Sequence, residues 1–112
     1  MTYEAEVVVR LTGAYERVTL EHGGNAPPAW TEDDVRGVLQ TMLMAVDRAV
    51  NDGENAARTV TFRGISWIVS PFDAGVAIAL EIPSGSVIAG PFDIAEARLS
   101  ALISKVMQGR VN

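Results

Sequence analysis

Cysteine is absent from this chain of 112 residues, and histidine and lysine each occur once. Without cysteine the chain has no disulfides, no thiolate zinc site and no cysteine nucleophile. A single histidine also leaves the chain short of the side chain that most often acts as a general base. The sequence contains no nucleophile elbow, zinc-ligand spacing or dinucleotide fingerprint. These absences argue against an enzyme, and we expect no catalytic residue, no metal and no other cofactor.

Positive charge is scarce as well. Nine lysine and arginine residues stand against 14 aspartate and glutamate residues, so the formal net charge is −5. An acidic surface repels a phosphate backbone, and we therefore expect no direct binding of nucleic acid. The same field attracts basic proteins, which makes a basic protein partner the favoured kind of partner.

Long apolar runs are missing too. The longest nearly uncharged stretch, residues 64–80, is interrupted by Pro71, Asp73 and Gly75 and is too broken to span a bilayer. The first residues carry an acidic Glu4 where a signal peptide would be basic, and no apolar segment follows. We therefore expect a cytoplasmic protein that does not enter a membrane.

Apolar residues recur with the periods of strands and helices. Alternation predicts five strands, at residues 3–11, 15–21, 59–69, 76–82 and 87–89. Spacing of three and four predicts two helices, at about residues 31–51 and 94–107. Thr31 is the expected cap of the first helix, and the acidic residues 32–34 complement its dipole. Asp93 is the expected cap of the second helix, with Glu96 at capping-box spacing.

The order of these elements predicts the fold class. Short turns between successive strands imply antiparallel neighbours. The expected architecture is α+β, an antiparallel sheet of about five strands in the order ββαβββα with two helices packed on one face. No linker or low-complexity segment divides the chain, so we predict one α+β domain over residues 1–112.

The tripeptide Pro-Phe-Asp occurs twice, at residues 71–73 and 91–93, each time after an apolar run. Proline cannot donate to a strand ladder, so each copy is predicted to end a strand. The two strands run in the same direction with one strand between them. Both copies should therefore lie at the same end of the sheet, roughly 10 Å apart at ~4.8 Å per strand. The expected local cluster consists of Phe72, Asp73, Phe92 and Asp93.

Two interpretations of this cluster are open. In the first, the two phenylalanines close the end of the core and the aspartates accept hydrogen bonds from nearby backbone N–H groups. In the second, this end of the sheet is a concave rim that binds a ligand or a partner. Phe72 and Phe92 would then line it.

Candidate partner-binding residues also follow from the strand at residues 59–69, whose alternation changes phase at Gly64. A bulge there would turn Trp67 into the core, and otherwise Trp67 lies on the sheet face away from the helices. Met44 is predicted to lie opposite the buried stripe of the first helix. Exposed tryptophan and methionine are typical of interfaces. The candidate partner-binding set is Trp67, Ile65, Ala77, Ala79, Met44, Phe72, Asp73 and Phe92.

The loop before the first helix offers weaker candidates. His22, the only histidine, is interpreted as a surface residue. Residues 23–25, Gly-Gly-Asn, lack the lysine of a phosphate-binding loop, and three acids follow at the helix start where a phosphate would sit. Those acids, residues 32–34, do not match the spacing of a calcium loop.

Together these observations predict a small acidic, non-enzymatic protein-binding module that forms a homodimer. An inhibitor, immunity-type or chaperone-type protein would fit this size and charge. Its basic partner would be, for example, a nucleic-acid-binding enzyme, because acidic groups compete with phosphates for the enzyme's basic residues. Two alternatives are kept: a small-molecule-binding or enzymatic domain that uses the Phe72 and Phe92 end of the sheet, and a structural subunit of a larger assembly.

Overall fold

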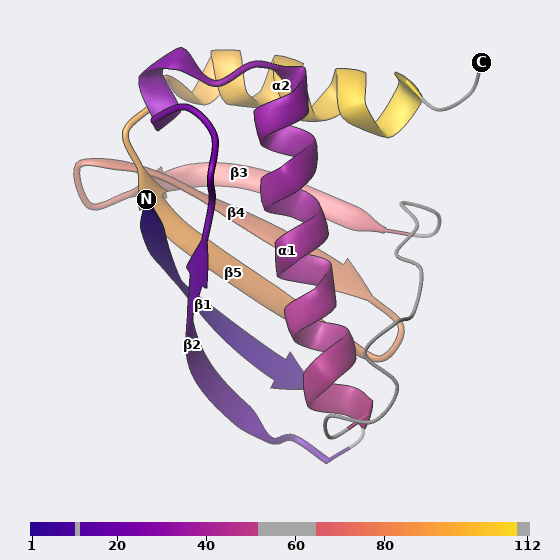
Figure 1. The fold of residues 1–112 in the computed structure, drawn as a ribbon. Coiled ribbons are helices and arrows are strands. Elements are labelled where there is room, and N and C mark those ends of the chain that lie inside the picture. Colours follow the sequence, from indigo (N-terminus) through magenta and orange to yellow (C-terminus); the bar gives the residue numbers. More distant parts are fainter. Residues whose placement is uncertain (11, 52–64, 110–112) are drawn as a thin grey trace.

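The computed structural model describes residues 1–10, 12–51 and 65–109, and it shows the predicted α+β fold (Figure 1). Five antiparallel strands form one sheet, and two helices cover one of its faces. A short 3-10 turn at Pro27–Ala29 precedes the first helix. The elements are β1 (Thr2–Val9), β2 (Tyr15–Glu21), α1 (Glu32–Asn51), β3 (Ser66–Phe72), β4 (Gly75–Ile82), β5 (Gly85–Phe92) and α2 (Glu96–Gly109).

The strands lie in the order β2-β1-β5-β4-β3. β1 and β2 form a hairpin, β3 to β5 form a meander, and the ladder between β1 and β5 joins these two units. α1 packs against β1, β5 and β2, whereas α2 contacts α1 and β3 (Figure 1). The face that carries the helices is called the inner face below, and the opposite face is called the outer face.

The start of α1 confirms Thr31 as its cap. The Thr31 side-chain oxygen lies 3.4 Å from the backbone N of Asp34, and the Asp34 carboxylate accepts the Thr31 backbone N–H at 2.9 Å. This reciprocal pair is a capping box in which aspartate takes the usual place of glutamate. Neither α1 nor α2, the two helices in the described part of the chain, is long and apolar enough to cross a membrane.

The predicted cap of α2 is wrong. The helix begins at Glu96, so Asp93 lies in the turn before it and not at the cap position. The reason is a tight turn in which the backbone N–H of Ile94 donates to the Phe92 carbonyl at 3.0 Å. That turn buries Ile94 in the core, and the first helical hydrogen bond then runs from Leu99 to the Ala95 carbonyl.

Trp67 and Ile65 lie on the inner face. Trp67 pairs across the ladder with the buried Leu80, and both Trp67 and Ile65 are partly buried against the core. Of the two orientations open from the sequence, the inward one is therefore found. The predicted bulge at Gly64 and the start of the strand at residues 59–64 lie outside the described residues.

Candidate functional site on the outer face of the sheet

One row of side chains crosses the outer face from edge to edge. Its cross-strand neighbours are, in order from β3 to β2, Ile68, Ala79, Ile88, Glu6 and Arg17. The three residues from the meander are apolar, and the two residues from the hairpin are charged. The outer face is thus divided into an apolar half and a charged half along the β1–β5 ladder.

The apolar half is exposed. Ile68, Ile88 and Phe72 are 60%, 47% and 46% exposed, respectively. Ala79 lies between the two isoleucines, so a low point separates two protruding aliphatic side chains. The uncovered face of an antiparallel sheet is commonly polar. A group of large exposed apolar side chains on such a face is a mark of an interaction surface.

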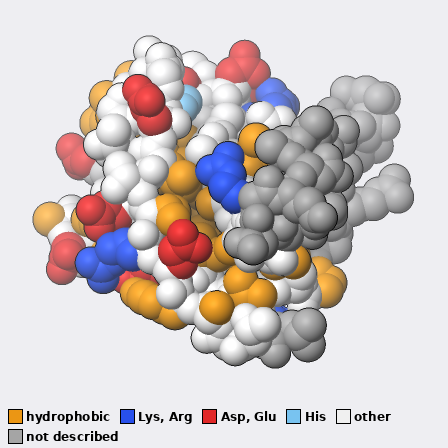
Figure 2. Space-filling model, turned by 60° about the horizontal axis from the view of Figure 1, so that its bottom comes forward, with side chains coloured by type: hydrophobic (Ala, Val, Ile, Leu, Met, Phe, Trp, Pro, Cys, Tyr) orange, Lys and Arg blue, Asp and Glu red, His pale blue; other side chains and the backbone are white. Residues whose placement is uncertain are grey.

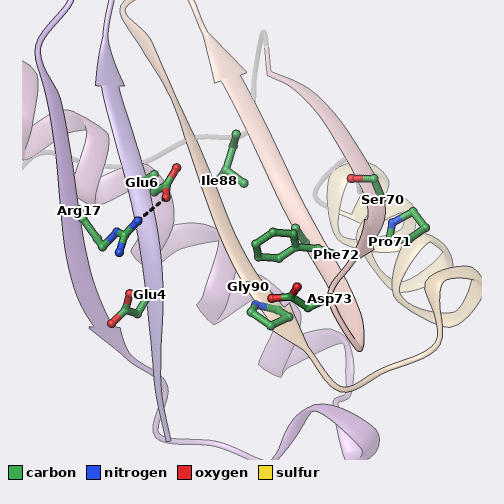
Figure 3. Close-up of a pocket in the computed structure, with 11 residues that line it drawn as sticks. Glu4, Glu6, Arg17, Ser70, Pro71, Phe72, Asp73, Ile88 and Gly90 are labelled. Carbon is green, nitrogen blue, oxygen red and sulfur yellow. Dashed lines mark hydrogen bonds and ion pairs between the residues drawn. The ribbon is translucent and has the colours of Figure 1, made fainter.

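A hollow of about 530 Å³ lies on the same face, next to this row (Figure 3). The Phe72 side chain lies over the middle strands, with Glu4, Glu6 and Arg17 on one side of it and Ser70 and Pro71 on the other (Figure 3). The remaining lining comes from Asp73, Ala77, Ile88, Gly90 and Pro91.

Acidic groups dominate the charge of this hollow. Glu4, Glu6 and Asp73 line it, and Arg17 is the single basic residue among its lining residues. The Arg17 guanidinium lies 3.0 Å from the Glu6 carboxylate (Figure 3). One acid is thereby neutralised, and the hollow keeps a net negative charge.

The two Pro-Phe-Asp copies lie at the same end of the sheet, as predicted, but the expected cluster does not form. Phe72 lies on the outer face, whereas Phe92 is 1% exposed and lies in the core. The cause is an irregularity in the β4–β5 pairing between Val76 and Ile78, opposite Gly90 with its φ of 143°. This irregularity changes the alternation of β5 and turns Phe92 inward. Phe92 therefore does not line the hollow, although Phe72 does.

The other predicted residues are divided between two surfaces. Ala77 and Ala79 lie on the outer face, and Ala77 is buried there while it lines the hollow. Asp73 lies in the β3–β4 turn, with a φ of 54°. Met44 is 39% exposed but belongs to α1, on the helix side of the sheet. Met44 and the outer face are therefore separate surfaces.

The sequence analysis missed Ile68, Ile88 and the acids of β1 as site residues. A signal was present in the uninterrupted apolar run formed by Trp67, Ile68 and Val69. Such a run has apolar residues on both faces and indicates a strand that is covered on both sides. The helices cover one side only, which leaves Ile68 exposed on the other side.

A second group of polar side chains lies buried before α1. His22 was predicted to be a surface residue, and this was wrong: it is buried, with its Nε2 3.0 Å from Oδ1 of Asp34. Asp34 also accepts hydrogen bonds from the backbone N–H and side-chain amide of Asn25, at 3.1 and 2.8 Å. Backbone N–H groups of Thr31 and Asn25 hold the pKa of Asp34 well below its usual range, despite its burial.

This group is a structural clamp on the loop between β2 and α1. The Asp34 carboxylate is satisfied by its own chain, because it accepts from His22, Asn25 and Thr31 together. The His22 ring also packs edge-on against Trp30, with ring centroids 5.9 Å apart. The alternation of β2 contained the signal for this position, since His22 continues the inward series of Val18 and Leu20.

Substitution of Gly24 tests this clamp. A Cβ atom at Gly24 would collide with the Asp34 carboxylate and lie 2.8 Å from His22 Nε2. Both side chains are buried and hydrogen-bonded, so Gly24→Ala is expected to lower the free energy of unfolding by about 1–3 kcal/mol. The matched control is Gly23→Ala, whose Cβ would meet nothing within 4 Å. Urea denaturation should separate the two variants, and equal stabilities would contradict the clamp.

A second hollow, of about 450 Å³, lies between α1 and β2. It is lined by Val18, Leu20, Ala45 and Ala49, together with polar and charged neighbours that include Arg48. Figure 2 shows hydrophobic side chains at the bottom of a depression that charged side chains border. This hollow has no aromatic lining residue and only one acid, Glu16, so it is a less distinctive candidate than the outer face.

Within residues 1–10, 12–51 and 65–109, no three histidine, aspartate or glutamate side chains come together in a way that would hold a metal ion. Comparison of the chain with protein-family models, with curated proteins and with solved structures gives no match. Its function is therefore inferred from the geometry of its own residues.

Proposed function

We propose that this chain is a non-enzymatic protein-binding module whose outer face binds a basic partner protein. The observation that carries the proposal is the exposed apolar row of Ile68, Ala79 and Ile88 beside the acidic residues of β1. Binding surfaces between proteins typically combine an apolar centre with a polar rim. The row and its charged neighbours have this arrangement.

The charge of the chain supports a basic partner. The net charge is −5, and Glu4 and Glu6 lie beside the apolar row on the strand next to β5. Acidic groups of this kind speed the encounter with a basic surface and exclude acidic proteins. An inhibitor or immunity-type protein would use them to occupy the basic site of a nucleic-acid-binding enzyme. A chaperone-type protein would use the same face to cover a basic segment of its client.

The homodimer predicted from the sequence stays a proposal. Its interface has to be a surface other than the outer face. Two copies that paired through their outer faces would leave no part of that face for the partner. The exposed Met44 side of α1 is the available alternative, because it lies on the helix side of the molecule.

Charged substitutions in the apolar row test the proposal. The double variant Ile68→Asp/Ile88→Asp is expected to bind the partner at least about tenfold more weakly, because it places two carboxylates in the centre of the interface. The measurement is retention of proteins from an extract of the source cells on immobilised protein, followed by titration of the retained protein. Raised salt should also weaken the association.

The matched control is Ala101→Asp, which adds a carboxylate at an exposed site of α2, on the helix side of the sheet. It should retain the same proteins as the parent chain. Circular dichroism should show that all variants keep their fold. Light scattering should show the oligomeric state of each variant. Equal retention by the double variant, or a parent dimer that the double variant abolishes, would contradict the assignment of the outer face to a basic partner.

A further inference from the structure

The hollow beside Phe72 has the size of a ligand site. Its volume of about 530 Å³ lies within the roughly 300–1,000 Å³ of typical ligand sites. Ala77 and Ile88 supply apolar surface, and the half-exposed Phe72 ring lies over the middle strands (Figure 3). The hollow therefore offers an aliphatic contact and an aromatic ring together.

Two carboxylates in this hollow have no partner within the part of the chain that the structure describes. Arg17 bonds Glu6, but the side chains of Glu4 and Asp73 make no hydrogen bond or ion pair there. Glu4 comes from β1 and Asp73 from the β3–β4 turn, so the two negative charges border the hollow from different sides (Figure 3). A ligand with a positive charge would be attracted from both sides.

The lining selects among cations. The described acids do not gather into a metal site. A lysine ammonium group is compact and strongly hydrated, whereas a guanidinium group is flat, stacks on aromatic rings and binds carboxylates through two parallel hydrogen bonds. The aliphatic stem of an arginine side chain can also lie along apolar surface such as that of Ile88.

We propose that this hollow binds the guanidinium group of an arginine side chain presented by the partner protein. The inference rests on the proposed function and adds to it the chemical group that is recognised. The aromatic ring of Phe72 stacks on the guanidinium plane, and the carboxylates of Glu4 and Asp73 balance its charge. The apolar row beside the hollow receives the rest of the partner surface.

An NMR titration with three capped tripeptides tests the recognition of arginine. The probes are acetyl-Gly-Arg-Gly-amide, its lysine counterpart and its citrulline counterpart, which is nearly isosteric with arginine but neutral. The arginine peptide is expected to bind with a Kd on the order of 1 mM. It should move the amide signals of Asp73 and Ile88 and bind about two- to fivefold more tightly than the lysine peptide. Equal effects of the arginine and citrulline peptides, or shifts centred elsewhere, would overturn the proposal.

Two conservative substitutions remove the negative charge without changing the fold. Asparagine tolerates the positive φ of residue 73, and glutamine keeps the length of the exposed Glu4 side chain. The double variant Glu4→Gln/Asp73→Asn should weaken binding of the arginine peptide about tenfold. The control Glu96→Gln, exposed at the start of α2, should bind it like the parent chain. An unchanged affinity in the double variant would show that these carboxylates do not form the site.

The same variants separate this inference from the proposed function. If the partner loses binding to Ile68→Asp/Ile88→Asp but binds Glu4→Gln/Asp73→Asn normally, the arginine site is overturned and the proposed function stands. If the arginine peptide binds at the hollow but no protein depends on the apolar row, the proposed function fails and the guanidinium site remains.

Discussion

Replacing Phe92 with alanine is expected to lower the free energy of unfolding by about 3–5 kcal/mol. The Phe92 ring is 1% exposed, and its centroid lies 5.3 Å from that of Tyr3 and 5.0 Å from that of Trp30. Alanine would leave a cavity where β1, β5 and the segment before α1 meet. Denaturant titration followed by circular dichroism measures the loss.

The matched control is Phe72→Ala, which removes the same side chain from the other copy of the tripeptide. Phe72 is 46% exposed on the outer face, so this variant should lose less than about 1 kcal/mol. It should instead weaken binding of the arginine peptide, because the aromatic wall of the hollow is gone. Equal losses of stability in the two variants would contradict the placement of the two rings on opposite faces.

Asp34→Asn is the second substitution with a large expected effect, a loss of about 2–4 kcal/mol in the free energy of unfolding. Both oxygens of the buried carboxylate accept hydrogen bonds, from Thr31, Asn25 and His22. An asparagine side chain has only one acceptor oxygen, because its NH2 group can only donate. The matched control is Asp33→Asn in the same turn of α1. The Asp33 side chain is exposed and pairs with Arg36 at 2.8 Å, so its replacement should cost less than about 1 kcal/mol.

The pH dependence of stability gives a second measure of Asp34. Its pKa in the folded state lies below its value in the unfolded state, which is about 3.9. The unfolded chain therefore binds more protons at mildly acidic pH, and stability rises with pH in that range. The contribution of Asp34 is fully present above about pH 4 and is lost as the pH falls toward its folded-state pKa. Below about pH 4 the parent chain should lose stability more steeply than Asp34→Asn, and parallel curves would contradict this role.

The periodicity of the sequence predicted the elements and the local connections. Strand β2 and the end of α1 lie where the alternation and the helical spacing placed them. The meander also followed from its short turns, and it correctly put both Pro-Phe-Asp copies at one end of the sheet. These features depend on contacts between neighbouring segments, which a local pattern describes well.

Features that depend on distant contacts were harder to predict. Phe92 points inward because of an irregularity between β4 and β5 opposite Gly90. The Gly90-Pro91 pair is a local signal of such an irregularity, but the sequence analysis interprets it only as the end of a strand. His22 is buried because Asp34 and Trp30 come from a later segment to meet it. Ile68 is exposed because the helices pack on the face that carries Trp67, and the alternation of this strand does not say which of its two apolar sides that is. In each case the alternation of a strand separates its residues into two faces, and only the packing of other segments decides which face is buried.

The central position of the β1–β5 ladder has a consequence for the order of folding. The hairpin and the meander can each form from neighbouring segments, but Glu6 can meet Ile88 only when the two ends of the chain come together. Closing so long a loop is entropically costly, and we expect this pairing to come late and to limit the folding rate. The apolar half of the outer face belongs to the meander and the acidic half to the hairpin. A partly folded chain would therefore present the apolar residues without their acidic neighbours, and the selectivity for a basic partner that we propose would arise only when this central ladder closes.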